Sequence, residues 1–328
     1  MEKKSLGNDI QKSVPATPVA LSRVGVTGLR RVLRLTNESG GRPLFFAEMD
    51  LFAHLGASRS GVHMSRFIEN MEEIASEIAS EASPDCETLA ERMALSIART
   101  QDTSRSEVRI RVQYPRTKRA PVSGRQVEDL YTFLGVAISD GASTRRAVGV
   151  EVNGLTVCPC AREMVSERSR ELLLQAGYSS AQADGIVAIL PLASHNQRGR
   201  GTLLLGTEMP VRAEELVDIV ESSMSSEIYE LLKRPDELHV VERAHHKPRF
   251  VEDVVREMIR GVAERLTHLP DETFVLASQE NMESIHMHNA FAERCALLGD
   301  IRRELSEPQN ASLRCRVLSL EAWLANLL

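Results

Sequence analysis

The sequence lacks a long apolar run. No stretch approaches the roughly 18 consecutive apolar residues of a membrane span, and the opening segment MEKKSLGNDIQKSVPATP has no apolar core for a signal peptide. We therefore expect a cytoplasmic protein with no membrane partner. Cysteine is scarce as well, because five residues are too few, and odd in number, for a disulfide framework. Any special cysteine is expected to act as a thiolate ligand or a nucleophile.

The chain also lacks an excess of positive charge. It carries 40 Lys and Arg against 46 Asp and Glu, a net charge of −6 at pH 7. A general nucleic-acid binder needs a positive field, so we expect no nucleic acid and a small-molecule partner, for which a local basic patch suffices. The hydrophobic share of 42% and the charged share of 26% exclude wholesale disorder. The 328 residues are long enough for two units of about 150 residues each.

Residue patterns predict an α+β protein with antiparallel sheets and helices on one face. Alternation predicts strands over 24–35, 44–52, 107–114 and 144–156, and helical spacing predicts helices over 64–80 and 86–100. A long polar loop is expected before residue 144. A similar order follows, with strands over 186–192, 202–209 and 273–277 and helices over 214–232, 251–266 and 312–328.

These patterns divide the chain into four parts. Residues 1–22 are polar, show no period and are interpreted as a flexible N-terminal arm. Residues 23–145 form a first unit and residues 146–305 a second unit with most of the candidate site residues. Residues 306–328 are expected to be a helical tail.

Two groups of reactive or polar residues follow predicted strands. Cys158 and Cys160 flank Pro159, whose fixed backbone sets the direction of each sulfur, although two small buried residues explain the pattern equally well. His195 lies within the polar segment Ser194–Gly199, directly after the apolar run 186–192. Polar groups are costly to bury without partners, which favours a site there over a polar loop that caps the sheet.

Two further groups flank predicted helices. Lys233 and Arg234 precede Glu237 at an expected helix end, where a basic pair commonly just complements the helix dipole. Glu252 opens the next helix, where carboxylates are ordinary first-turn residues.

A fourth group is a pair of histidines. His286 and His288 are two residues apart, so their side chains point the same way if the segment is extended. The four groups together offer thiolate, imidazole and carboxylate, a mixture that suits a borderline divalent ion such as zinc or ferrous iron.

Six motifs in one order resemble the type IB GTP cyclohydrolases, also called the GTP cyclohydrolase IV family. They are Gly61–Phe67, Cys158–Cys160, Ser194–Arg198, Leu232–Glu237, Phe250–Asp253 and Glu283–His286. Six motifs over most of the chain are far more specific than any one of them. The segment Glu163–Leu190, between the cysteines and the histidine, makes the chain similar to the long, archaeal-type branch.

The resemblance implies tandem tunnel-fold (T-fold) units that assemble into a homotetramer with active sites near subunit interfaces. It implies hydrolysis of GTP to 7,8-dihydroneopterin 3′-triphosphate and formate, the first step of tetrahydrofolate biosynthesis. In the archaeal-type branch the product can instead be 7,8-dihydroneopterin 2′,3′-cyclic phosphate.

The same resemblance implies roles for individual residues. The metal ligands would be Cys158, His195, Glu237 and His286, with zinc, Fe(II) or manganese as the ion, and Cys158 and His195 would also take part in catalysis. Cys160 can replace Cys158 as the ligand, and either thiolate can serve covalent chemistry instead. Glu252 would anchor the guanine edge, and the cations facing the triphosphate would be Arg198, Lys233, Arg234 and Arg66.

Three other functions stay open at this stage. A tunnel-fold nitrile reductase would use a cysteine nucleophile and a nicotinamide coenzyme, but the histidine groups argue against it. A zinc nucleobase deaminase lacks its His-x-Glu and Pro-Cys-x-x-Cys elements here. A purine-binding scaffold without turnover does not account for four sets of ligand side chains. One departure from the resemblance, Ala244–Pro248, affects local substrate contacts and not the metal ligands.

Overall fold

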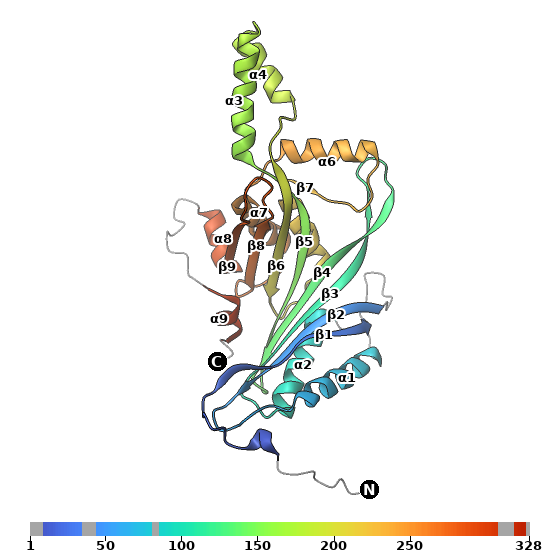
Figure 1. Cartoon of the computed structure of the whole chain (residues 1–328), viewed down its shortest axis with the longest axis vertical. Coiled ribbons are helices and arrows are strands. Elements are labelled where there is room, and N and C mark those ends of the chain that lie inside the picture. The colour runs from blue at the N-terminus through green and yellow to red at the C-terminus, as the bar shows by residue number, and fades with distance from the viewer. Residues whose placement is uncertain (1–8, 35–43, 81–84, 308–317, 326–328) are drawn as a thin grey trace.

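The computed structural model describes residues 9–34, 44–80, 85–307 and 318–325. Within these ranges nine strands form a single antiparallel sheet in the order β1-β2-β3-β4-β5-β6-β8-β9, and β7 pairs with β5 (Figure 1). The strands are β1 (Leu21–Arg34), β2 (Leu44–Leu55), β3 (Ser106–Arg119), β4 (Gln126–Ser139), β5 (Thr144–Val157), β6 (Asn196–Gly206), β7 (Ser226–Glu227), β8 (Phe274–Asn281) and β9 (Ala290–Leu297).

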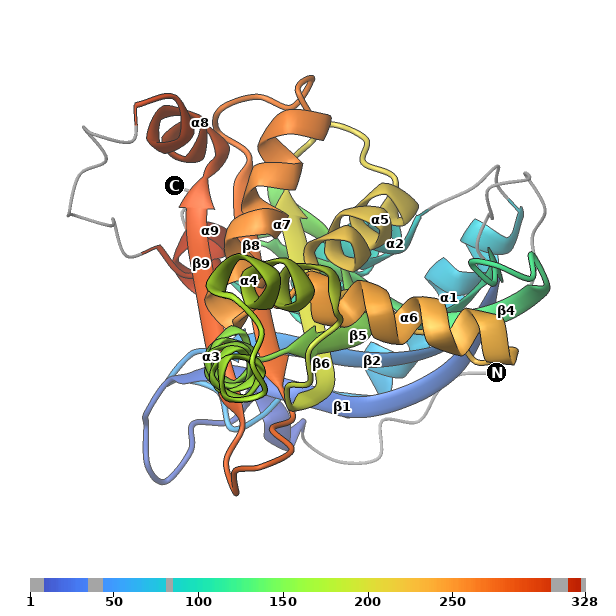
Figure 2. The same cartoon turned by 90° about the horizontal axis from the view of Figure 1, so that it is seen from above.

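The helices of the described ranges lie mainly on one face of this sheet and beyond one of its ends. They are α1 (Met64–Ser80), α2 (Cys86–Thr100), α3 (Pro159–Gln175), α4 (Ser180–Ile189), α5 (Ala213–Ser223), α6 (Arg234–His246), α7 (Val251–Arg265), α8 (Leu298–Ser306) and α9 (Leu320–Ala325), after a short 3-10 helix at Ile10–Lys12. Figure 2 shows α2, α5 and α7 on the same side of the strands. The predicted α+β class with an antiparallel sheet is therefore confirmed, whereas α9 lies on the opposite face, where Trp323 stacks on Phe274.

The core lies between these helices and the sheet. Along β2 every second side chain is buried, and α7 buries Val251, Val254, Val255, Met258 and Val262, the spacing of one apolar helix face. One cluster of buried side chains continues from the first half of the chain into the second. The boundary predicted at residues 145–146 falls inside β5. The first half has the element order β-β-α-α-β-β, and the second half has the same order if α3, α4, β7 and α6 are counted as insertions.

Several sequence predictions are wrong in the element they assign. The run 186–192 is not a strand, because Ser179 caps α4 through a capping box with Gln182 and the helix continues to Ile189. The helix predicted over 214–232 ends at Ser223, and the chain then turns into β7. The polar loop expected before residue 144 contains β4, in which exposed or half-buried residues alternate with buried ones from Glu128 to Leu134.

The ends of the chain are only partly described. In the predicted arm, residues 10–12 form a 3-10 turn and β1 begins at Leu21, whereas residues 1–8 lie outside the described residues. In the predicted tail, α9 is helical, and residues 308–317 and 326–328 lie outside the described residues.

Helices α3 and α4 form a hairpin that projects from one end of the sheet (Figure 1). They pack on each other, and α3 has no buried residue. This hairpin is the segment inserted between the two sequence motifs that contain Cys158 and His195.

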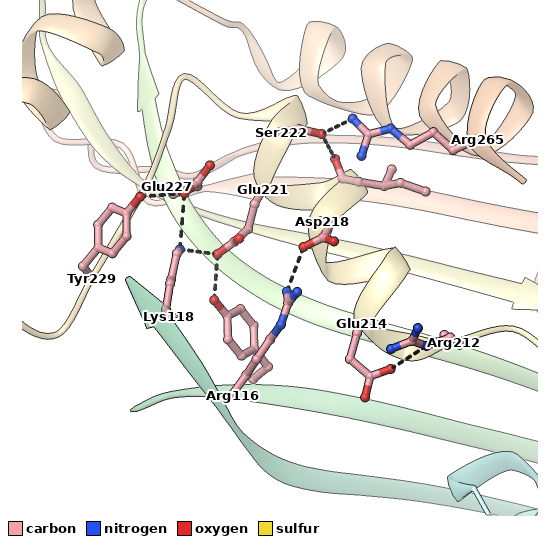
Figure 3. A network of polar contacts seen from close by, with 12 residues as sticks. Arg116, Lys118, Arg212, Glu214, Asp218, Glu221, Ser222, Glu227, Tyr229 and Arg265 are labelled. Carbon is pink, nitrogen blue, oxygen red and sulfur yellow. Dashed lines mark hydrogen bonds and ion pairs between the residues drawn. The ribbon is translucent and has the colours of Figure 1, made fainter. Parts of the chain in front are cut away.

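The sheet splits between β4 and β5, and a polar network bridges the gap (Figure 3). Strand β4 pairs with β5 only as far as Thr132, beyond which β7 lies beside β5. Lys118 Nζ lies 2.6 Å from Glu221 Oε1 and 3.6 Å from Glu227 Oε2. The hydroxyl of Tyr131 donates to Glu221 at 2.8 Å. Lys118 is thus the cation that the buried Glu221 shares with the half-buried Glu227, which also pairs with Arg243 at 3.3 Å.

Substitution of Lys118 by Met tests this network. The change would leave Glu221 and Glu227 without their shared cation, so we expect the free energy of unfolding to fall by about 3–5 kcal/mol in urea denaturation. Adding Glu221→Gln should recover part of the loss, because it removes a buried unpaired charge. Lys12→Met, at an exposed ion pair, serves as the control. A loss below about 1 kcal/mol, the range of surface ion pairs, would contradict the bridging role.

Candidate active site

Four segments meet around a pocket of about 230 Å³ at the end of the sheet below the α3–α4 hairpin. They are the end of β5, the start of β6, the start of α7 and the loop after β8. The lining residues are Cys158, His195, Gln197, Arg249, Phe250, Val251, Glu252, Asn281, Glu283, His286, His288 and Ala290. Main-chain hydrogen bonds hold the segments together, from Arg249 N to Val157 O at 2.9 Å and from Met282 N to Arg198 O at 3.0 Å.

Cys158 and His195 face each other because β5 and β6 pair up to their ends. The last register pair is Val157 with Asn196, and Cys158 N then donates to His195 O at 3.1 Å. The Ser194 hydroxyl donates to Cys158 O at 2.7 Å. Cys158 also caps α3, with Pro159 in the first turn. The hairpin therefore begins and ends at two adjacent pocket residues.

The histidines lie close together in the pocket. The rings of His195 and His286 are perpendicular, with centroids 6.4 Å apart, and His286 stacks on His288 at 5.2 Å. The prediction that His286 and His288 point the same way is confirmed. Glu283, whose side chain is 9% exposed, places Oε2 at 3.8 Å from His195 Nδ1. The pocket thus contains one thiol, three imidazole rings and the carboxylate of Glu283.

A second row of polar side chains supports the pocket from within the sheet. Asn281 lines the pocket and accepts a hydrogen bond from the buried Gln279 at 3.0 Å. Gly199 stands opposite both, and a Cβ there would lie 2.2 Å from Gln279 Nε2 and 2.8 Å from Asn281 Oδ1. Glycine at this position leaves the space that these two amides occupy.

The structure brings four of the predicted site residues to this pocket and separates the others from it. Cys158, His195, Glu252 and His286 line it. Five predicted residues do not, and Cys160 is exposed beside it. Arg198 lines another pocket with Tyr131, Asn153 and Glu221, and Arg66 on α1 donates to Thr100 O. Lys233, Arg234 and the exposed Glu237 lie at the start of α6.

The basic pair lies at a helix beginning, so the predicted helix end at residues 231–237 is wrong. Lys233 caps α6, and the buried Asp236 accepts hydrogen bonds from the main-chain N–H groups of Val122, Ser123 and Lys233. Burial opposes ionisation of Asp236, but these donors and the Ser123 hydroxyl outweigh it and hold the pKa of that carboxyl well below its usual range. Asp236 therefore ties the turn between β3 and β4 to α6.

The donor set can be tested against a metal ion. As the side chains stand, no three His, Cys, Asp or Glu residues of the described ranges are close enough together to hold one. The chemistry of the lining groups nevertheless fits a borderline divalent ion, since Cys158 offers sulfur and His195 and His286 offer nitrogen. These three side chains would have to move closer together to bind an ion.

Sequence reasoning gave no role to four lining residues, Gln197, Arg249, Asn281 and Glu283. Gln197 and Glu283 were visible only as members of the Ser194–Arg198 and Glu283–His286 motifs. No local sequence pattern predicted that Asn281 and Arg249 line the pocket. Their positions depend on the pairing of β8 with β6 and on the turn before α7.

A pocket that combines a thiol, imidazoles and carboxylates at the end of an antiparallel sheet has the side chains typical of an enzyme active site. Residues 8–292 match the model of the family described as type I GTP cyclohydrolase folE2. The chain therefore belongs to the type I GTP cyclohydrolase family, and it is a GTP cyclohydrolase enzyme. The family predicted from the six motifs is confirmed at this level.

Curated relatives agree over nearly their full length. The chain is 40% identical over 311 residues to GTP cyclohydrolase MptA of Methanothermobacter thermautotrophicus, covering 92% of this chain and 97% of the relative. It is 37% identical over 304 residues to GTP cyclohydrolase MptA of Methanocaldococcus jannaschii, covering 90% and 97%.

Among solved structures, the uricase of Arthrobacter globiformis is similar with a TM-score of 0.49 and 10% identity, covering 84% of this chain and 93% of the uricase. The Bacillus fastidious uricase reaches a TM-score of 0.45 at 11% identity, covering 91% and 98%. Similarity at this level is too low to assign a function. None of the helices in the described ranges is both long enough and apolar enough to cross a membrane.

Proposed function

We propose that the protein opens the imidazole ring of GTP with water and releases its C8 as formate in the pocket of Cys158, His195 and His286. The observation that carries the proposal is the convergence of these three residues, from separate segments, in one pocket with Glu252. We propose 7,8-dihydroneopterin 3′-triphosphate as the other product, which would supply tetrahydrofolate biosynthesis. The histidines and the family leave a nitrile reductase without support.

The second candidate product is 7,8-dihydroneopterin 2′,3′-cyclic phosphate. Two observations favour it. The similarity to relatives from methanogens runs over almost the whole chain, and the insertion predicted for the archaeal-type branch is present as the α3–α4 hairpin. The two products differ in their phosphate groups, so product analysis decides between them.

We propose that Cys158, His195 and His286 hold a divalent ion, zinc, Fe(II) or manganese. Such an ion, when bound, lowers the pKa of a water molecule and supplies hydroxide near neutral pH. The expected fourth ligand, Glu237, is exposed on α6 and does not line this pocket. Its carboxylate would have to come from a neighbouring copy of the chain.

The pocket's own residues supply the remaining functions. Glu252 can accept from the N1–H and the exocyclic amine of guanine together, which adenine cannot match. Glu283 lies near His195 and can exchange protons with groups in the pocket. Phe250 lines the same wall as Glu252 and offers an apolar surface to the base.

We propose that the chain assembles as a homotetramer in a tunnel fold, with β1–β4 and β5–β9 as tandem units. The support is the sheet face opposite most of the helices, which α9 covers only in part. Phe46 on β2 is 74% exposed and Phe291 on β9 is 62% exposed, and their strand neighbours turn toward the helices. Exposed aromatic side chains on one sheet face are typical of a surface that another subunit covers.

Incubation of metal-reconstituted protein with GTP tests the reaction. We expect formate and a pterin that becomes fluorescent on oxidation, and chromatography of its phosphate pattern identifies the product. Cys158→Ala, His195→Ala and His286→Ala should each abolish formate release while the protein stays folded by circular dichroism. Wild-type turnover in any variant would remove that residue from the reaction centre.

Glu252→Gln tests recognition of the base. The amide presents an N–H where the carboxylate accepts, so one of the two contacts to guanine is lost and the charge assistance disappears. We expect the KM for GTP to rise at least about tenfold, the factor that 1.4 kcal/mol of lost interaction represents. Glu264→Gln, on the same helix but outside the pocket lining, is the control. An unchanged KM and rate in Glu252→Gln would refute the anchor role.

A further inference from the structure

A chain of hydrogen bonds runs from the interior of the sheet to the ring of His195. Gln197 Oε1 lies 3.1 Å from His195 Nδ1, and Gln197 Nε2 donates to Thr156 Oγ1 at 3.2 Å. The Thr156 hydroxyl donates to the main-chain oxygen of Gln197 at 3.4 Å. Thr156 is 0% exposed and Gln197 is 6% exposed. The reaction proposed above uses neither residue, yet Gln197 lines the pocket and Thr156 bonds to it from the interior of the sheet.

The Thr156 hydroxyl sets the orientation of the Gln197 amide. A hydroxyl has a single proton, and here the main-chain oxygen of Gln197 takes it. Thr156 Oγ1 must therefore accept from Gln197 Nε2, which turns Gln197 Oε1 toward His195. An acceptor beside Nδ1 requires a proton on that nitrogen, so the lone pair of the neutral ring is left on Nε2.

Other groups near the His195 ring do not replace this contact. Glu283 Oε2, at 3.8 Å from Nδ1, is beyond hydrogen-bond distance. Thr156 and Gln197 are also cross-strand neighbours in the register of β5 and β6. The same pairing that brings Cys158 and His195 together therefore fixes the amide beneath the ring.

We propose that Gln197, held by Thr156, is a positioning residue that fixes the orientation and the Nδ1–H tautomer of His195. The inference rests on the proposed function, in which His195 binds the metal ion, and explains how its Nε2 is kept free of a proton. Residues that orient a metal-bound histidine in this way typically change metal affinity by about 10- to 100-fold when they are lost.

The tautomer can be measured by ¹⁵N NMR of histidine-labelled, metal-free protein at a pH where the ring is neutral, with His195→Gln to assign the signal. We expect Nδ1–H in the wild type. Gln197→Met removes both the oxygen and the nitrogen of the side-chain amide and should lose this preference. Gln197→Glu keeps an acceptor and should retain it. Thr156→Val should weaken it and Thr156→Ser restore it. Thr202→Val, the same change on strand β6, is the matched control.

Zinc affinity, measured by competition with a chelator, gives a second readout. We expect binding to be about 10- to 100-fold weaker in Gln197→Met than in the wild type or the Thr202→Val control. An Nε2–H tautomer in the wild type, or an unchanged tautomer in Gln197→Met, would overturn the inference. Absence of GTP turnover in the wild type would overturn the proposed function alone, because the tautomer is measured without metal or substrate.

Discussion

The pairing of β5 with β6 is the constraint on which the site depends. Antiparallel hydrogen bonds continue to the last residues of both strands, so Cys158 and His195, far apart in sequence, become neighbours. Further into the sheet, Thr156 and Gln197 are cross-strand neighbours whose side chains are joined by a hydrogen bond. A slip of one residue in the register would turn these side chains to the opposite face. The sheet therefore fixes the positions of Cys158 and His195, whereas His286 comes from the loop after β8.

The same constraint explains how a long insertion is tolerated. The α3–α4 hairpin leaves the sheet at Cys158 and returns just before His195, where main-chain hydrogen bonds close its base. An insertion whose two ends are already paired adds little strain to the strands below it. The other contributors, the start of α7 and the loop after β8, reach the pocket through hydrogen bonds to Val157 and Arg198.

The sequence predicted the parts of this fold that depend on local patterns. The strand before Cys158, the helix over 251–266 and the pairing of His286 with His288 all follow from the spacing of apolar or polar residues along the chain. Helix α4 was predicted as a strand because an apolar run of six or seven residues has no distinguishing period. Lys233 and Arg234 were predicted to lie at the end of a helix over 214–232. The apolar spacing in that stretch does not indicate that α5 ends at Ser223.

The site roles of Cys158, His195, Glu252 and His286 followed from the resemblance of the six motifs to one family and not from a local pattern. Cys158, His195 and His286 come from segments whose strands lie side by side, β5, β6 and β8. Glu237 lies on a helix whose place depends on the tie between Asp236 and the turn at Ser123, a contact between residues more than a hundred positions apart. No pattern in the sequence reports such a tie.

The central claim is that one sulfur and two imidazole nitrogens of this pocket bind a single ion. X-ray absorption spectroscopy of the zinc-loaded protein measures this directly. We expect one sulfur at about 2.3 Å and at least two nitrogens at about 2.0–2.1 Å around zinc, with the sulfur lost in Cys158→Ser. A zinc environment of oxygen alone, or a spectrum unchanged by Cys158→Ser, would contradict it.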